Sequence, residues 1–313
     1  MILHTVLGAL IITIGLLGLF GNINILISTY RITPRIKSNY LIGILAFCDS
    51  ICIVCEFENA FREIFGVRSY RRECFWNISI YLVLFVVQSY IMTAIAFDRL
   101  YALSFPLRYQ QTSILKYLIC ACTPGITISL SVFVIGILTL DNEPITACNP
   151  PTAYSPLATK VWNKSILLSI GLTLSAYLAA VLVLVIKSRN LKLLPTSNPK
   201  YFVFKAQQKV TKSCIVIITA FIFTWCNCHL SVSIVTISGA SEDVVNMYTN
   251  LMVIPAMLCY SQSYYIYFLT STVYRKSFIH QLRSLLSFRL VICTKGNNGF
   301  FIRRHVVHYI SDT

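Results

Sequence analysis

Several residues in this sequence carry side chains that could do chemistry. Asp98 and Arg99 form a possible ion pair, and Pro106 follows Arg99 by seven residues. Asp49 is an isolated carboxyl group in an apolar stretch, and His229 is the only histidine deep within such a stretch. Neither a His-x-x-x-His nor a Gly-x-Ser-x-Gly pattern occurs, so the sequence offers no catalytic constellation and no cofactor is expected. We therefore predict a protein that is not an enzyme.

The elements that position these residues are predicted from hydropathy. The chain is 56% apolar and 12% charged over 313 residues, which is too hydrophobic for a soluble domain of this size. A helix needs about 20 mainly apolar residues to cross a hydrocarbon core. We predict an all-α membrane protein, a seven-transmembrane helix bundle, with spans near 3–29, 39–62, 74–98, 116–140, 163–187, 209–237 and 245–270.

The positive charges are distributed unequally between the two sides of these spans. If the first span runs outside to inside, the inner segments hold 20 of the 26 lysines and arginines. The positive-inside rule then places the N-terminus outside and the C-terminus in the cytoplasm. Most of the net charge of +15 is explained by this topology, so we expect no nucleic-acid partner. A short surface helix near 271–285 and a basic cytoplasmic tail at 286–313 complete the chain.

Two of the twelve cysteines fall on the outer side. Cys74 opens the third span, and Cys148 lies midway along the loop that follows the fourth span. Both are in the oxidising compartment, where a disulfide persists. We predict a Cys74–Cys148 bridge that holds the longest outer loop over the bundle; two free thiols are the alternative.

The motifs at the helix ends resemble those of rhodopsin-like G-protein-coupled receptors. The resemblance rests on Asp98-Arg99-Leu100, with Leu where Tyr is usual, and on Phe105-Pro106-Leu107 after it. Gly21-Asn22 and Leu45-Ala46-Phe47-Cys48-Asp49 match two further motifs. With Cys74-Phe75-Trp76, the chain looks most like the SX class of nematode serpentine receptors, over roughly Gly18 to Phe278. The receptor domain is accordingly expected at 1–278.

This resemblance implies roles for individual residues. It assigns G-protein coupling to five positions, namely Asp98, Arg99, Pro106, Tyr177 and Tyr267. It assigns Asn22 and Asp49 to an inner polar core that often binds sodium, although Gln88 and Ser263 depart from the usual pattern there. A hydrogen-bonded or protonated Asp49 is the alternative. Asn227 replaces the usual proline of the sixth span, so a proline kink is not guaranteed there.

The expected ligand pocket is in the outer half of the bundle. Tyr81 and Phe85 are four residues apart, as are Trp225 and His229, so each pair lies on one helix face. The resemblance directs both faces to the central cavity, with Trp225 at its floor. Glu56 and Glu58 could form a negative rim for a cationic ligand, unless Arg62 neutralises Glu58. Ordinary helix packing is the alternative for each aromatic side chain.

The function implied is that of a chemosensory receptor. Such a receptor binds a small molecule or small peptide and activates a heterotrimeric G protein, in the plasma membrane of a sensory neuron or another cell. A small-solute transporter and a non-coupling membrane scaffold are the alternatives. A transporter would be expected to have paired internal repeats, and the sequence has no such symmetry.

Overall fold

Helices dominate the fold. The computed structural model describes residues 2–32, 36–67, 69–145, 147–191, 215–217 and 219–294. The helices are α1 (Ile2–Arg31), α2 (Lys37–Phe65), α3 (Arg71–Asn77), α4 (Ser79–Ser104), α5 (Pro106–Gln111), α6 (Ile114–Leu138), α7 (Pro150–Ala153), α8 (Pro156–Leu191), the π-helix η1 (Ile222–Cys226), α10 (Asn227–Ile237), α11 (Glu242–Leu251), α12 (Val253–Thr270) and α13 (Thr272–Thr294). Two short strands, β1 (Ser69–Tyr70) and β2 (Pro144–Ile145), pair antiparallel.

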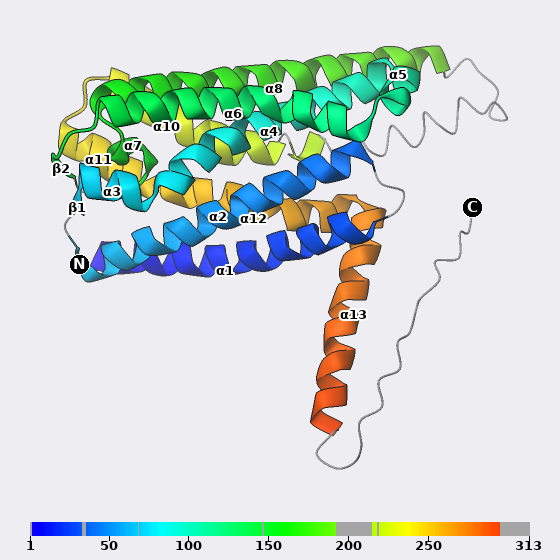
Figure 1. The fold of residues 1–313 in the computed structure, drawn as a ribbon, viewed down its shortest axis with the longest axis horizontal. Helices are drawn as coiled ribbons and strands as arrows, with labels where there is room; N and C mark the ends of the chain where they lie inside the picture. The colour runs from blue at the N-terminus through cyan, green and yellow to red at the C-terminus, as the bar shows by residue number, and fades with distance from the viewer. Residues whose placement is uncertain are drawn as a thin grey trace.

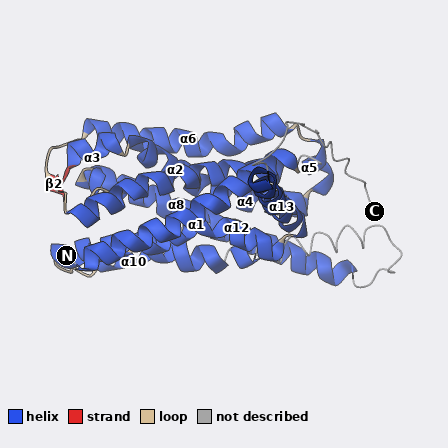
Figure 2. Ribbon diagram, turned by 90° about the horizontal axis from the view of Figure 1, so that it is seen from below, coloured by secondary structure: helices blue, strands red, loops and turns tan. Residues whose placement is uncertain are grey.

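The long helices lie side by side along the longest axis of the molecule (Figure 1). Within this bundle α4 packs against α2, α6 and α8, and α1 packs against α2 and α12. The helix α13 leaves the bundle at a steep angle in Figure 1 and is seen nearly end-on in Figure 2. A bundle that crosses a membrane would therefore place α13 along the membrane surface.

Among the described residues, six helical stretches are long and apolar enough to cross a membrane. They are Thr5–Arg31, Lys37–Phe65, Ser79–Ser104, Ile114–Leu138, Pro156–Lys187 and Ile215–Ile237. The seventh predicted span falls on α11 and α12, which meet at Met252. Serine, glutamine and tyrosine residues interrupt the apolar sequence of α12, and several of them, namely Tyr260, Ser261, Tyr264 and Tyr267, are buried in the bundle.

Several helices extend beyond the predicted spans. The helix α8 begins at Pro156 instead of 163, α4 ends at Ser104 instead of 98, and α13 continues to Thr294. Charged residues mark the limit of the hydrocarbon layer, but they do not end a helix. Residues 209–214 of the predicted sixth span and 295–313 of the predicted tail lie outside the described residues.

The distribution of side chains suits a lipid environment. On α6, large apolar residues face outward, including Leu115, Ile119, Ile126, Leu130 and Val134. Polar side chains are instead buried between helices: Thr93 Oγ1 lies 2.9 Å from Thr173 Oγ1, and Ser89 hydrogen-bonds Ser169. Exposed polar groups would be costly in hydrocarbon, so interhelical contact is the favourable place for them.

Glycines on α1 allow a close approach to α12. A Cβ atom at Gly18 would come within 2.2 Å of Ser261 Oγ, and one at Gly21 within 2.6 Å of Tyr264 Cβ. Small residues at such contacts let helix backbones approach each other in membranes. Gly18 and Gly21 thus let α1 pack closely against α12.

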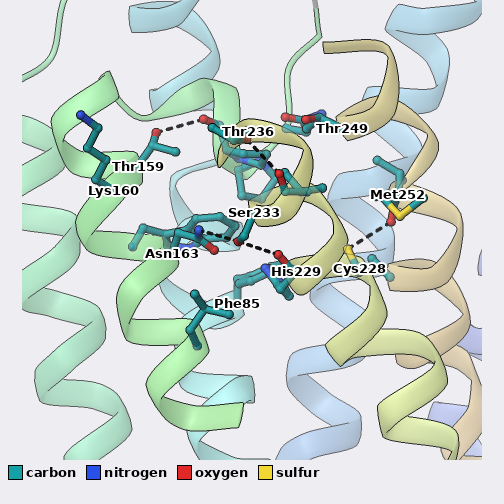
Figure 3. Close-up of a pocket in the computed structure, with 18 of the residues that line it drawn as sticks. Phe85, Thr159, Lys160, Asn163, Cys228, His229, Ser233, Thr236, Thr249 and Met252 are labelled. Carbon is teal, nitrogen blue, oxygen red and sulfur yellow. Dashed lines mark hydrogen bonds between the residues drawn. The ribbon is translucent and has the colours of Figure 1, made fainter. Parts of the chain in front are cut away.

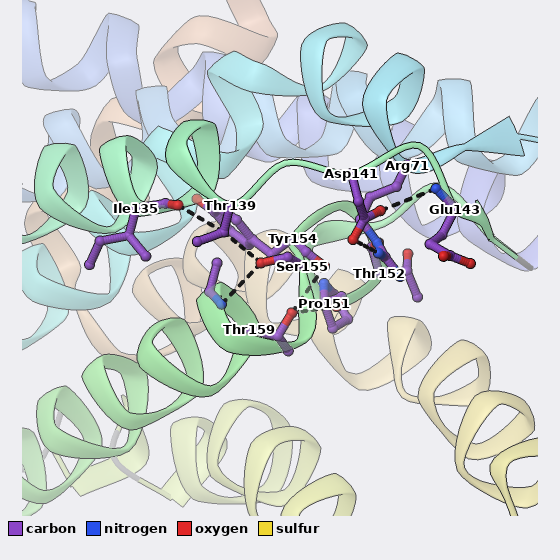
Figure 4. A network of polar contacts seen from close by, with 11 residues as sticks. Arg71, Ile135, Thr139, Asp141, Glu143, Pro151, Thr152, Tyr154, Ser155 and Thr159 are labelled. Atoms are coloured by element: carbon purple, nitrogen blue, oxygen red, sulfur yellow. Dashed lines mark hydrogen bonds and ion pairs between the residues drawn. The ribbon is translucent and has the colours of Figure 1, made fainter.

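A cap closes the end of the bundle at which α1 begins. It contains the β1–β2 pair, α3 and α7, and the Cys74–Cys148 disulfide holds it together. Figure 4 shows its polar network: Arg71 pairs with Asp141 and donates to the Thr152 carbonyl at 3.3 Å, and Thr139 Oγ1 lies 2.6 Å from Ser155 Oγ. The predicted disulfide is confirmed.

Candidate functional site

A cavity of about 370 Å³ lies beneath this cap, between α2, α4, α8, α10, α11 and α12. Four of the five residues expected in a ligand pocket line it, namely Glu56, Tyr81, Phe85 and His229. Figure 3 shows this cavity with Asn163 and Ser233 facing each other from α8 and α10, joined by a 3.1 Å hydrogen bond. The volume lies within the range of small-molecule sites.

An aromatic cluster forms the deep end of the cavity. The Phe85 ring lies 5.1 Å from that of Trp162 and 4.8 Å from that of Trp225, between ring centroids. The His229 ring lies 4.9 Å from the Trp225 ring. Trp225 does not itself line the cavity but supports Phe85 and His229 from beneath. The Phe85 and His229 rings thus connect the cavity wall to Trp225.

Three ring nitrogens of this cluster are buried without a hydrogen-bond partner among the described residues. They are His229 Nε2, Trp162 Nε1 and Trp225 Nε1. Trp162 and His229 also line the cavity. Buried polar atoms are normally hydrogen-bonded, so the Trp162 and His229 nitrogens are candidates for a hydrogen bond to a polar ligand.

The two acidic side chains expected at the rim differ in position. Glu58 is partly exposed and pairs with Arg62 at 2.9 Å, as the four-residue spacing predicts. Glu56 is only 2% exposed and lies inside the cavity instead of at its rim. Tyr81 Oη donates to Glu56 Oε1 at 2.5 Å, and Asn59 Nδ2 donates to Oε2 at 3.0 Å. These hydrogen bonds hold Glu56 inside the cavity, deeper than the expected rim, and its role in ligand binding stays a prediction.

The Asp98-Arg99 pair lies near the other end of α4, about 25 Å along the helix from Tyr81 by helix rise. Asp98 is fully buried, with its Oδ2 atom 3.3 Å from Arg99 Nη2. The hydroxyls of Tyr109 and Tyr117 each donate to Asp98 Oδ1 at 2.9 Å. Burial, and after it the Asp98 charge, raises the pKa of Tyr109. The Tyr109 hydroxyl therefore remains a protonated donor.

Lys37 extends this cluster to the start of α2. Its ammonium donates to the Tyr109 carbonyl and lies 4.4 Å from the centre of the Tyr109 ring. It also lies 5.6 Å from the Tyr117 ring centre. The four elements α2, α4, α5 and α6 are thus tied together around one carboxyl group.

The other residues expected at this end occupy separate places. Pro106 begins α5, and Tyr177 is buried on α8 beside Ala96 of α4. Tyr267 on α12 stacks on Tyr274 at 4.9 Å between ring centroids. Burial raises the pKa of Tyr274 to about 12. These positions fit the expected cytoplasmic face, but their role in coupling stays a prediction.

The sequence was compared with models of known protein families. The model described as "Serpentine type 7TM GPCR chemoreceptor Srsx" matches residues 15–282. The chain belongs to this family. No curated protein matches this chain. The family assignment confirms the resemblance, the seven-helix membrane fold and a non-enzymatic, chemosensory receptor class, whereas the orientation of the termini stays a prediction.

The inner polar core of the receptor differs from the expected pairing. Asn22 Nδ2 donates to the Tyr260 carbonyl at 3.0 Å, and no hydrogen bond joins Asn22 to Asp49 within the described parts of the chain. Asn22 Oδ1 and Asp49 Oδ1 are both buried without a partner there. Oxygen atoms are the ligands that hard cations prefer, so this donor set is compatible with sodium. A sodium site at Asp49 stays a prediction.

A single turn of π-helix, η1, lies in the sixth span where the motif usually has a proline kink; it is called the π-turn below. The turn η1 contains Trp225 and ends just before Asn227, which replaces the proline of the motif. Thr224 donates to the Ala220 carbonyl at 2.7 Å, and Gln262 donates to Thr224 Oγ1 at 3.3 Å. π-Turns bend helices and often occur at functional sites. The receptor therefore keeps a local irregularity here without proline.

Sequence reasoning missed several residues at both ends of the bundle. Asn59, Trp162 and Asn163 contribute to the cavity or its hydrogen bonds, and Tyr109 and Tyr117 bind Asp98. Only Tyr109 had a signal, because it lies two residues after the matching Phe105-Pro106-Leu107 motif. The others meet their partners across helices, which helical spacing alone does not reveal.

Proposed function

We propose that this chemoreceptor binds a small ligand in the cavity beneath the cap and activates a heterotrimeric G protein at the Asp98-Arg99 end, in the plasma membrane. The observation that carries the proposal is the cavity itself. It combines apolar walls with a few polar groups, as ligand sites do. His229 Nε2 and Trp162 Nε1 offer unpartnered nitrogen atoms to that ligand.

Coupling between the two ends is expected to pass through the helix that carries Trp225. The Trp225 ring contacts Phe85 and His229 of the cavity wall, and the π-turn lies in the same stretch of helix. A π-turn is a weak point at which the two halves of a helix can change their relative angle. Two packed arrangements of the bundle would then transmit binding to the cytoplasmic face.

The test is a G-protein readout in cells that express the full chain and are exposed to a panel of small odorants and metabolites. Among variants that reach the cell surface, Tyr81→Ala and His229→Ala should each shift the half-maximal concentration about tenfold, which corresponds to about 1.4 kcal/mol. Neither should lower constitutive signalling. Trp225→Ala should change the maximal response, because it lies beneath the ligand and beside the π-turn.

Two outward-facing residues of the same helix serve as matched controls. Phe223 is 73% exposed within the π-turn, and Leu230 is 45% exposed next to His229. Phe223→Ala and Leu230→Ala should leave both potency and maximal response unchanged. If Tyr81→Ala and His229→Ala also leave potency unchanged, the ligand binds elsewhere and the proposal fails.

A further inference from the structure

The cavity contains a buried carboxyl group, that of Glu56, which has no basic partner among the described residues. Glu56 lines the cavity at 2% exposure. Its two hydrogen-bond donors, Tyr81 Oη and Asn59 Nδ2, are both neutral. Within the described ranges, no ion pair includes Glu56. A buried carboxylate is costly in a membrane protein unless a cation is close to it.

Two arginines at this end of the bundle, Arg62 and Arg71, are engaged with other acids. Arg62 pairs with Glu58 at 2.9 Å and lies 3.7 Å from Glu73, and Arg71 pairs with Asp141. The positive charge that would balance Glu56 is therefore best supplied from within the cavity.

The surroundings of Glu56 suit a cation that carries an apolar group. The Tyr81 ring, whose hydroxyl binds Glu56, lies 5.8 Å from the Phe85 ring. Phe85 in turn contacts Trp162 and Trp225. Aromatic faces attract cations, and they also bury the apolar part of a ligand. We propose that the ligand is a small organic ammonium ion, with its charged nitrogen at Glu56 and its apolar part against Phe85 and Trp162.

This inference rests on the proposed function of the cavity, and the main competing ligand class is an organic anion. Lys160 and Lys164 line the mouth of the same cavity. Both are exposed, and Figure 3 shows the Lys160 side chain reaching away from Phe85 and His229. Water and salt screen exposed charges, whereas a buried charge acts at a low effective dielectric constant. Glu56 therefore contributes more to ligand selection than the two lysines do.

The test uses the purified full chain in lipid nanodiscs and three probes of similar shape. They are 2-phenylethylamine, which is cationic, 2-phenylethanol, which is neutral, and 3-phenylpropanoate, which is anionic. Each is titrated to millimolar concentration while the thermal unfolding midpoint is measured. We expect the amine to raise the midpoint in a saturable manner and the other two probes to have little effect.

Variants then assign the effect to one carboxyl group. Glu56→Gln should weaken the apparent affinity for the amine by roughly tenfold or more, because it removes a buried charged partner. Glu58→Gln is the matched control, since Glu58 lies on the same helix, pairs with Arg62 and is outside the cavity lining. It should leave amine binding unchanged. Glu56→Asp, which keeps the carboxyl group, should retain part of the rise in the unfolding midpoint that the amine causes.

Several outcomes would overturn the inference. An equal or larger midpoint shift with 2-phenylethanol or 3-phenylpropanoate would exclude an ammonium preference, and so would an amine shift that persists in Glu56→Gln. No shift with any probe would also reject the assignment. The comparison of the three probes on the unaltered chain decides the question even if Glu56→Gln does not fold. In each case the odorant panel with Tyr81→Ala and His229→Ala tests the receptor function separately.

Discussion

Removal of the Cys74–Cys148 disulfide should destabilise the receptor by an amount that can be estimated from its position in the chain. The bridge joins residues separated by 74 positions. In the chain-entropy model, a bridge that closes a loop of that length contributes about 4.5 kcal/mol at 25 °C. In a bilayer this is an upper bound, because the helices between the two cysteines persist when tertiary packing is lost. We therefore expect a loss of roughly 2–4 kcal/mol.

Three variants test whether the two cysteines act as one unit. Cys74→Ser, Cys148→Ser and the double variant should have similar losses of thermal stability and surface expression, because each removes the same bond. The assay is the thermal unfolding midpoint of the solubilised receptor, with surface staining in parallel. Cys120→Ser serves as the control, since Cys120 is a free, exposed cysteine. If the losses of the two single variants add in the double variant, the cysteines stabilise the receptor independently and the reasoning is refuted.

Four further outcomes are expected. Arg99→Ala should abolish or strongly reduce G-protein activation while ligand binding, measured by a thermal shift, is retained; unchanged signalling would contradict the assignment. A tag after Thr313 should be stained only in permeabilised cells, because the inner segments hold most of the basic residues. The Asn163-Lys164-Ser165 sequence matches the glycosylation pattern, but Asn163 hydrogen-bonds Ser233 inside the cavity, so we expect Asn163 to be unmodified. Glycosidase treatment should then give the same mass change in the Asn163→Gln variant as in the unaltered chain. Tyr109→Phe and Tyr117→Phe should each lower stability by about 2 kcal/mol in thermal unfolding, because each removes a hydrogen bond to the Asp98 carboxyl; unchanged midpoints would argue against these bonds.

The positions of the membrane-spanning helices along the sequence were largely predictable, because a segment that crosses the lipid must be long, apolar and helical. A run of about 20 residues without charge has few alternatives to a membrane-spanning helix. Helix ends were less predictable. Lys160 and Lys164 end an apolar run, yet α8 continues through them to Pro156, because lysine is a good helix former.

Residues that line the cavity were predictable where their spacing places them on the same face of one helix. Tyr81 with Phe85 is such a case, and both line the cavity. Contacts between distant segments were not predictable. Tyr117 reaches Asp98 from another helix, and Asn163 meets Ser233 across 70 residues of sequence. The depth of Glu56 also depended on such contacts, since Tyr81 and Asn59 draw its carboxyl group inward.

The π-turn at Ile222–Cys226 has an evolutionary consequence for this receptor. Such a turn accommodates one more residue than the same length of α-helix. Deletion of a single codon within the turn would therefore leave a regular helix whose two halves keep their faces in register, and His229 would still face the cavity. A deletion in a regular α-helix would instead rotate one half against the other by about 100°. The turn is thus a place where the sixth span can lose a residue during evolution without exchanging the side chains that line the cavity.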